Sequence, residues 1–172
     1  QSYSQPNWPS REDALQKFSN FNPSRYAKTR NFLNGHISQM SPHIKHGVIQ
    51  NRELLNIIQD KFNFQESEKF IQELAWRDFW RSYAYHHPDQ LWTDVEEYKT
   101  GFKSSDYLDD LPNDIKTGET PAQVINSFIQ ELTQTGYLHN HARMYVASYV
   151  VHFRRVKWQA GAKFFMTHLL DG

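Results

Sequence analysis

The sequence predicts an all-α protein, and three observations carry that prediction. Apolar side chains recur at spacings of three and four residues, as Leu54, Leu55, Ile58 and Phe62 do. Residues typical of helix starts and glycines typical of helix ends punctuate the chain. No stretch of useful length alternates between apolar and polar side chains, as a strand with one exposed face would. We therefore expect one compact multi-helical domain over residues 1–172, with seven or eight helices.

Helix-start residues locate the first four helices. The expected starts are Ser10 as an N-cap, Asn22-Pro23, Ser41-Pro42 and the amphipathic run 51–62. Gly35 should end the second helix and Gly47 the third, because glycine adopts the left-handed conformation that often follows a last turn.

The later helices are set by proline, glycine and periodicity. A long helix should run from about residue 66 to His86 and stop before Pro88. Residues 88–119, rich in Asp, Gly, Ser and Pro, predict an irregular connection. Thr120-Pro121 should begin the next helix, which ends near Gly136, and the runs 138–153 and 158–170 should form the last two.

Composition excludes several classes of protein. Lys+Arg and Asp+Glu each number 19, so the net charge is zero. The net charge therefore indicates neither a nucleic acid nor an anionic membrane as a partner, although a chain of zero net charge can still carry a local basic patch. The absence of cysteine excludes disulfides, cysteine zinc sites and thiol nucleophiles. No apolar run approaches the ~20 residues of a membrane span, and no signal-peptide core is visible. We expect a cytoplasmic protein without a membrane partner.

The stretch QELAWRDFW, residues 72–80, combines aromatic and charged side chains. Because most of it is apolar or aromatic, we expect it to be largely buried. On a helix Glu73, Trp76 and Arg77 share one face. Glu73 and Arg77 then form a simple ion pair at the core edge, or this face is a pocket wall on which a flat ligand stacks. Aromatic residues make up 15% of the chain, which suits either a core or such a pocket.

The stretch TGYLHNHARM, residues 135–144, places Asn140, Arg143 and Met144 on one helical face. An asparagine amide offers both a donor and an acceptor to a ring edge, and an arginine binds carboxylate or phosphate with two parallel hydrogen bonds. The structural alternative is that Asn140 caps the helix and Arg143 forms an internal ion pair.

Three further clusters leave alternatives open. Ser38 and Ser41 flank a helix start whose free N–H groups suit phosphate, unless Ser41 is an ordinary N-cap. The basic run 154–157 either ends a helix or faces phosphate. His43 and His46 have a metal-like spacing but no acidic third ligand at a diagnostic distance, so no metal is predicted.

The order of these stretches resembles the FAD-binding helical domain of the photolyase/cryptochrome family, from about Pro23 to Gly172. The stretches are RYAKTRNFLNG, ISQMSP, ELAWRDFW, TGYLHNHARM and WQAGAKFFMTHLLDG. The resemblance implies FAD as cofactor. It also implies that the α/β antenna domain is absent, with no antenna chromophore expected, and that the domain continues beyond Gly172.

The resemblance also implies a role for individual residues. Tyr26 corresponds to a residue at the flavin phosphates or ribityl chain, and Ser38, Gln39, Met40 and Ser41 to the loop around the pyrophosphate. Arg77 lies beside the cofactor. Asn140, Arg143, Met144 and Asp171 correspond to residues around the flavin ring, with Arg143 paired to an aspartate beyond this chain.

The catalytic residues implied by the resemblance are Glu73, Trp76 and Trp158. Glu73 and Trp76 would contact a DNA lesion, and Trp158 would be the middle member of an electron-transfer chain whose outermost member falls at Tyr98. Departures from the family pattern include Ile37 and Gln39 in the phosphate loop and His141 after Asn140.

Three functions follow from this comparison. One is light-driven repair of pyrimidine dimers in damaged DNA by an electron from reduced FAD. The alternative is a cryptochrome-like blue-light sensor or redox module that binds FAD without repair. The third, a helical protein that has lost FAD, fits least well with the joint retention of Tyr26, Ser38, Ser41, Asn140 and Arg143. The sequence gives no oligomeric state.

Overall fold

The protein is all-α, as predicted. The computed structural model describes residues 9–172, which contain nine α-helices, short 3-10 and π segments, and one isolated parallel bridge between Leu108 and Val156. These residues divide into two compact units, 9–93 and 94–172, which are described separately. Between residues 9 and 172, no helix combines the length and apolar character needed to cross a bilayer.

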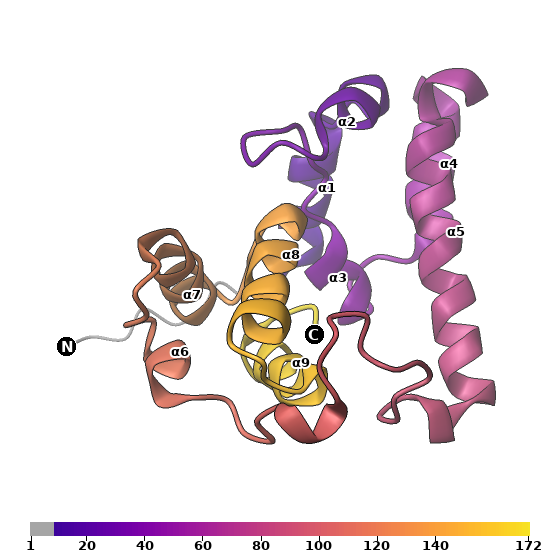
Figure 1. Ribbon diagram of the computed structural model, residues 1–172. Helices are drawn as coiled ribbons and strands as arrows, with labels where there is room; N and C mark the ends of the chain where they lie inside the picture. The colour runs from indigo at the N-terminus through magenta and orange to yellow at the C-terminus, as the bar shows by residue number, and fades with distance from the viewer. Residues whose placement is uncertain (1–8) are drawn as a thin grey trace. The chain divides into compact units, whose positions relative to one another are not determined.

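The unit 9–93 is built around one long helix, α5. Both α2 and α4 pack against it (Figure 1). Its core is a cluster of nine buried apolar side chains that includes Phe18, Leu54, Ile58 and Phe70. Its helices are α1 (Arg11–Ser19), α2 (Pro23–Thr29), α3 (Ser41–Lys45), α4 (Asn51–Lys61) and α5 (Phe64–His86), followed by the 3-10 turn η1 (Pro88–Gln90).

Side-chain caps fix the helix starts in this unit. Ser10 Oγ accepts a hydrogen bond from the Asp13 backbone N–H at 3.1 Å, and Asn22 Oδ1 accepts one from Arg25 at 2.9 Å. Both predicted caps are thereby confirmed. The predicted end at Gly35 is wrong: α2 ends at Thr29, because turn hydrogen bonds from Phe32 to Thr29 and from Gly35 to Phe32 replace the helical pattern.

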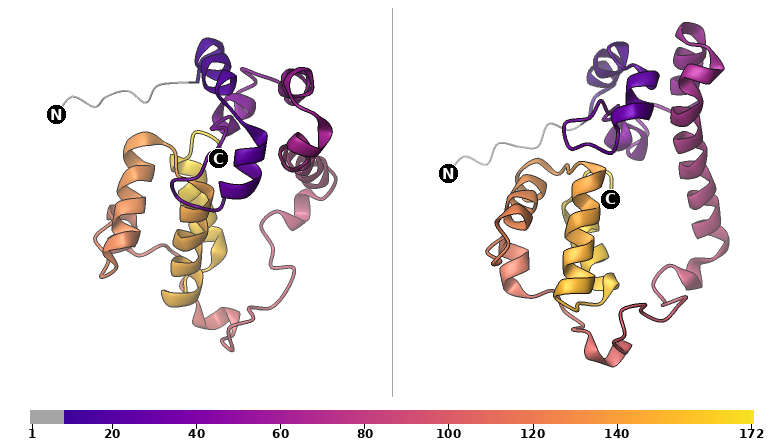
Figure 2. Two further views of the ribbon diagram at one scale, coloured as in Figure 1. Left: turned by 90° about the horizontal axis from the view of Figure 1, so that it is seen from above. Right: turned by 45° about the horizontal axis from the view of Figure 1, so that its top comes forward.

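The unit 94–172 has its own core, which includes Ile115, Ile129, Leu132 and Val146. Helix α8 continues directly into the π-helix η3, and α9 packs beside them, as both views in Figure 2 show. The elements are η2 (Ser104–Asp106), α6 (Asn113–Thr117), α7 (Gln123–Thr135), α8 (Asn140–Ser148), η3 (Tyr149–Phe153) and α9 (Trp158–His168).

Two predictions for residues 88–136 differ from the structure. The expected irregular connection 88–119 begins in the unit 9–93 and contains α6 and the two 3-10 turns η1 and η2. Helix α7 begins at Gln123 rather than at Thr120, because Thr120 and Asn126 exchange hydrogen bonds of 2.8 Å that hold a turn before the helix. The end at Gly136 is confirmed, with φ of 69° in the left-handed region.

Candidate functional site

An arginine–aspartate pair lies at the centre of the predicted site residues in the unit 94–172. Arg143 Nη2 donates to Asp171 Oδ2 at 3.0 Å, and Arg143 Nε donates to the Leu138 carbonyl at 2.8 Å. The Asp171 side chain is only 3% exposed and that of Arg143 23%. Among the described residues, the aspartate that pairs with Arg143 is Asp171, a partner that the sequence had not indicated.

One of the two carboxylate oxygens of Asp171 lacks a hydrogen-bond partner within the described part of the chain. Its Oδ1 atom is buried and accepts no hydrogen bond from any described residue. Buried polar atoms in folded proteins are nearly always hydrogen-bonded, so an open one needs an explanation. A carboxylate oxygen held in this way suits the N–H edge of a planar heterocycle, and the isoalloxazine ring of FAD carries such a group. The residues present thus fit the flavin that the sequence implied.

His139, rather than Asn140, caps α8. Its Nδ1 atom accepts the backbone N–H of His141 at 3.1 Å, so the interpretation of Asn140 as a cap is wrong. His139 is 7% exposed, and its Nε2 atom has no hydrogen-bond partner among the described residues. Burial lowers the pKa of this imidazole, and the charges of His141 and Arg143 act in the same direction. Histidine is not a usual N-cap, which is why sequence reasoning missed it.

The other predicted residues of α8 lie at the surface. Asn140 is the first residue of the helix, and both Asn140 and Met144 are exposed. Arg143 also lies over the ring of Tyr137, with 5.6 Å between the guanidinium and the ring centroid. Burial raises the pKa of the Tyr137 phenol. The helix thus exposes an amide and a thioether near a buried polar cluster.

Trp158 begins α9 and is held by two loop residues. Its indole Nε1 donates to Asp94 Oδ1 at 2.6 Å, and its backbone N–H donates to the Tyr98 hydroxyl over a longer 3.4 Å. The two aromatic residues that the resemblance assigned to one electron-transfer chain are therefore in contact. Sequence reasoning missed Asp94, because it lies 64 residues from Trp158 and no local pattern links them.

The face of α5 that carries Glu73, Trp76 and Arg77 is not buried as expected. The core side of this helix is formed by Phe70 and Leu74, whereas Trp76 and Trp80 are 56% and 61% exposed. Arg77 is partly exposed.

Glu73 takes part in two ion pairs on this face. Its Oε1 atom lies 3.0 Å from Lys69 Nζ and 3.7 Å from Arg30 Nε. Lys69 also lies over the Trp76 ring, 4.9 Å from its centroid. The carboxylate is therefore held between two cations beside an exposed indole.

The predicted phosphate loop is sharply turned. Gln39 has a left-handed φ of 54°, which is uncommon for a residue with a side chain, and Ser38 Oγ accepts the Met40 N–H at 3.4 Å. Met40 is the N-cap of α3 without a side-chain cap bond, and Ser41 is the first helical residue, so Ser41 is not an ordinary N-cap. Met40 is buried in the core, which leaves only its backbone to face a ligand.

Tyr26 lies on α2 in the same unit. Its ring packs edge-on against Phe70, with centroids 5.7 Å apart, and at 5.6 Å from Phe21. It is partly exposed, so its ring supports the core while part of the side chain reaches the surface.

The basic run 154–157 is largely paired within its own unit. Arg154 binds Asp114 through two bonds of 2.6 and 3.1 Å, which lowers the pKa of that carboxyl group. Lys157 Nζ pairs with Asp109 at 2.5 Å, and Arg155 lies over the Phe102 ring. Two of the three cations thus have structural partners.

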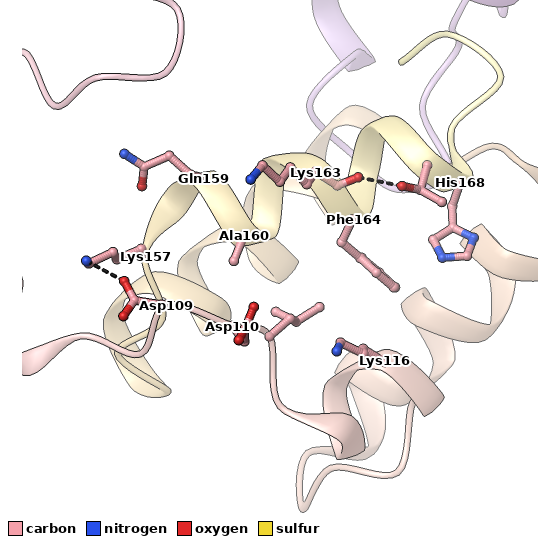
Figure 3. A pocket seen from close by; sticks show the side chains of 11 residues that line it. Asp109, Asp110, Lys116, Lys157, Gln159, Ala160, Lys163, Phe164 and His168 are labelled. Atoms are coloured by element: carbon pink, nitrogen blue, oxygen red, sulfur yellow. Dashed lines mark hydrogen bonds and ion pairs between the residues drawn. The ribbon is translucent and has the colours of Figure 1, made fainter.

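The Lys157–Asp109 pair lies at one end of a cleft of about 630 Å³ beside α9 (Figure 3). Lys116, Lys163 and Phe164 also line this cleft. None of the predicted site residues lines it, so the cleft is not part of the predicted flavin site. In residues 9–172, no group of three or more histidine or acidic side chains is arranged to hold a metal ion.

The all-α fold thus carries, beside Arg143, a buried carboxylate oxygen of Asp171 that no described residue hydrogen-bonds. Residues 70–172 match the family described as the FAD binding domain of DNA photolyase, and the chain belongs to this family. It is therefore a flavoprotein related to photolyases and cryptochromes, with FAD as its cofactor.

Individual relatives give the same result. The chain is 31% identical over 160 residues to a deoxyribodipyrimidine photo-lyase of Alkalihalophilus pseudofirmus, covering 91% of this chain and 33% of that protein. It is 30% identical over 164 residues to a cryptochrome DASH of Idiomarina loihiensis, covering 90% and 35%. The chain thus spans about a third of the length of these relatives.

A solved structure shares the fold. The class III photolyase of Agrobacterium tumefaciens matches with a TM-score of 0.76 and 23% identity, over 98% of this chain and 38% of that one. At this level of identity the similarity shows the fold alone.

Proposed function

We propose that this chain is the flavin-binding part of a photolyase that uses blue light to repair pyrimidine dimers in damaged DNA. The relative from Alkalihalophilus pseudofirmus is named for that activity. FAD, when bound, supplies light-driven one-electron chemistry. Because the chain spans about a third of its relatives, the activity is proposed for the whole protein to which this sequence belongs.

The observation that carries the proposal is the open oxygen of Asp171. Arg143 holds the other oxygen at 3.0 Å, so Oδ1 is fixed in place and free to accept an N–H from the flavin ring. Asn140 adds a donor and an acceptor at the start of α8, and Met144 an apolar contact. We assign these four residues to the ring of FAD.

The resemblance supplies the remaining assignments. In the unit 9–93, Tyr26 and residues 38–41 are proposed for the phosphate and ribityl end of FAD, and Arg77 for a position beside the cofactor. Glu73 accepts a hydrogen bond from the lesion, and Trp76 stacks on it. In the unit 94–172, Trp158 relays electrons. The proposal keeps residues 1–172 together as one FAD-binding domain.

The test is dimer repair by the whole protein that contains this sequence, loaded with FAD. An oligonucleotide carrying a thymine dimer is incubated with that protein, FAD and a reductant, in blue light and in darkness. The proposal predicts light-dependent loss of the dimer, lower in Trp76→Ala than in Trp80→Ala. Trp80 is the matched control, because it is similarly exposed on the same helix. A dimer that stays intact in light with FAD bound would overturn the repair assignment.

A light sensor without repair activity is the second candidate, and the paired basic run favours it. DNA binding depends on cations that neutralise phosphates, but Arg154 and Lys157 are engaged by Asp114 and Asp109. The similarity to a cryptochrome DASH fits this candidate as well. It predicts flavin that responds to light while salt-dependent binding to DNA is weak.

A further inference from the structure

The cleft beside α9 is large enough to hold a small molecule. Its volume of about 630 Å³ lies within the range of about 300–1,000 Å³ that is usual for ligand pockets. One wall is α9, and the other is the segment 109–111 together with Lys116 of α6 (Figure 3). Both walls belong to the unit 94–172, so one compact part of the chain forms the whole cleft.

The apolar side chains that line the cleft suit a flat ring. They are Leu111, Ala160 and Phe164. The His168 ring lies edge-on to the Phe164 ring, with 4.6 Å between the centroids, and so limits the movement of the phenyl group. Nucleobases stack on aromatic side chains of this kind, because every base has a flat face.

The lysines that line the cleft suit an anionic group. Lys157 is neutralised by Asp109 at 2.5 Å, whereas Lys116 forms no hydrogen bond or ion pair with any residue between 9 and 172. Lys163 adds a second cation from α9. A phosphate monoester carries a charge of about −1.5 to −2 at neutral pH, which two lysines balance, whereas a carboxylate would balance only one.

Asp110 restricts the rest of the ligand. Figure 3 shows its carboxylate between the Lys157–Asp109 pair and Lys116, and it accepts no hydrogen bond from any described residue. A carboxylate accepts hydrogen bonds and repels a further anion. The ring should therefore carry an N–H donor, and the ligand should carry one phosphate rather than several.

We propose that this cleft binds a mononucleotide. The base stacks on Phe164 and donates an N–H to Asp110, and the phosphate lies against Lys116 and Lys163. The proposal goes beyond the repair function and does not depend on it, because no residue assigned to FAD, to the lesion or to the electron relay lines the cleft.

The experiment uses the whole protein that contains this sequence, with FAD present so that the flavin site does not take up the probe. The probe is uridine 5′-monophosphate, whose base carries an N–H. Uridine lacks the phosphate, and ribose 5-phosphate lacks the base. Equilibrium dialysis gives the three affinities. We expect saturable binding of the nucleotide and at least about tenfold weaker binding of the other two, because the charged hydrogen bonds and the stacked base each contribute that much.

Lys116→Met tests the cation without disturbing the core, because Lys116 is exposed. We expect the affinity for the nucleotide to fall at least about tenfold. Lys99→Met is the matched control, since Lys99 is an exposed lysine of the same unit that does not line the cleft. Circular dichroism shows that both variants are folded.

Hydrogen exchange with mass spectrometry locates the bound nucleotide. The proposal predicts slower exchange in residues 109–116 and 157–168 when uridine 5′-monophosphate is present. Absence of saturable binding, equal affinities for the nucleotide and ribose 5-phosphate, or an unchanged affinity in Lys116→Met would overturn the proposal. Slower exchange only in other segments would overturn it as well.

Discussion

Asp171 and Asp114 each pair with an arginine, but their surroundings differ. Asp171 is 3% exposed and keeps an open oxygen, whereas the side chain of Asp114 is 33% exposed and uses both oxygens on Arg154. Replacing each aspartate by asparagine therefore distinguishes the carboxylate that we propose as a ligand for FAD from one that only stabilises the fold.

Asp171→Asn should weaken FAD binding about tenfold or more, because a hydrogen bond to a charged group contributes roughly 1.5–3 kcal/mol. Asp114→Asn should leave the affinity unchanged and cost about 1 kcal/mol of stability at most, as exposed ion pairs do. Fluorescence titration with FAD measures both, and circular dichroism shows that each variant is folded. Equal affinities in the two variants would contradict the assignment of Asp171.

His139 should make stability depend on pH. Its folded pKa lies below the ordinary value of 6.5 because burial disfavours the charged ring. Between those two values the unfolded chain binds more protons, so stability is lost as the pH falls from about 6.5 through the folded pKa. Protonation of Nδ1 would also remove the cap on α8.

The measurement is urea unfolding of the wild type and of His139→Asn at about pH 7.5 and about pH 5, values on either side of the usual histidine pKa. Asparagine is a good N-cap that does not titrate in this range, so the variant should lose less stability on acidification. His152→Asn, at an exposed position, is the control. An identical pH dependence in wild type and His139→Asn would exclude His139 as its source.

For single residues, the sequence predicted chemical roles but not the partners in the folded chain. Arg143 and Asp171 were both identified as site residues, but their pairing was not, because 28 residues separate them. Asp94 carries no pattern of its own and becomes visible only through its bond to Trp158. Residue type and local spacing indicate what a side chain can do, whereas the partner across the fold comes from tertiary packing.

At the level of elements, the turn after α7 positions the segment that carries Asp171. Gly136 has φ of 69°, its carbonyl accepts the Leu170 N–H at 2.8 Å, and an added Cβ would lie 2.7 Å from Leu170 Cγ. Gly101 has a similar φ of 82° but open space around it. Both glycines thus have a positive φ that disfavours a side chain, but only Gly136 has a neighbour that an added Cβ would contact.

Gly136→Ala should destabilise the protein more than Gly101→Ala does. Both variants lose about 1 kcal/mol because alanine disfavours positive φ. Gly136→Ala should lose roughly a further 1–3 kcal/mol from overpacking against Leu170. Urea unfolding of both variants gives the difference directly. If both variants lost the same free energy of unfolding, the close contact with Leu170 would not contribute to the difference.

Helix starts were more predictable than helix surfaces. Ser10 and Asn22 were identified correctly, because a capping side chain acts within three residues of its own position. Burial of the 72–80 stretch was predicted from its aromatic content and proved wrong. Only the stripe with Phe70 and Leu74 reaches the core, so the indoles of the opposite face remain exposed.

On the scale of the whole molecule, the described residues form two hydrophobic cores with no residue in common. Leu54 lies in one core and Leu132 in the other, and both are fully buried. Truncating either leucine to alanine should lower the free energy of unfolding by about 2–5 kcal/mol. We expect faster hydrogen exchange confined to residues 9–93 in Leu54→Ala and to 94–172 in Leu132→Ala.

Hydrogen exchange with mass spectrometry resolves the two segments within one sample. Equal acceleration in both segments from either variant would show a single cooperative unit instead. That outcome would support the assignment of residues 1–172 to one domain, which remains a proposal from the family resemblance.

We expect this chain to bind FAD and to respond to blue light, and an absorption spectrum of the purified chain tests both properties in one experiment. The chain is incubated with FAD, separated from free ligand, and measured in darkness and again after blue light with an electron donor present. We predict flavin bands that remain with the protein and bleach on illumination. A chain that stays colourless after incubation with FAD would contradict both FAD binding and the response to light.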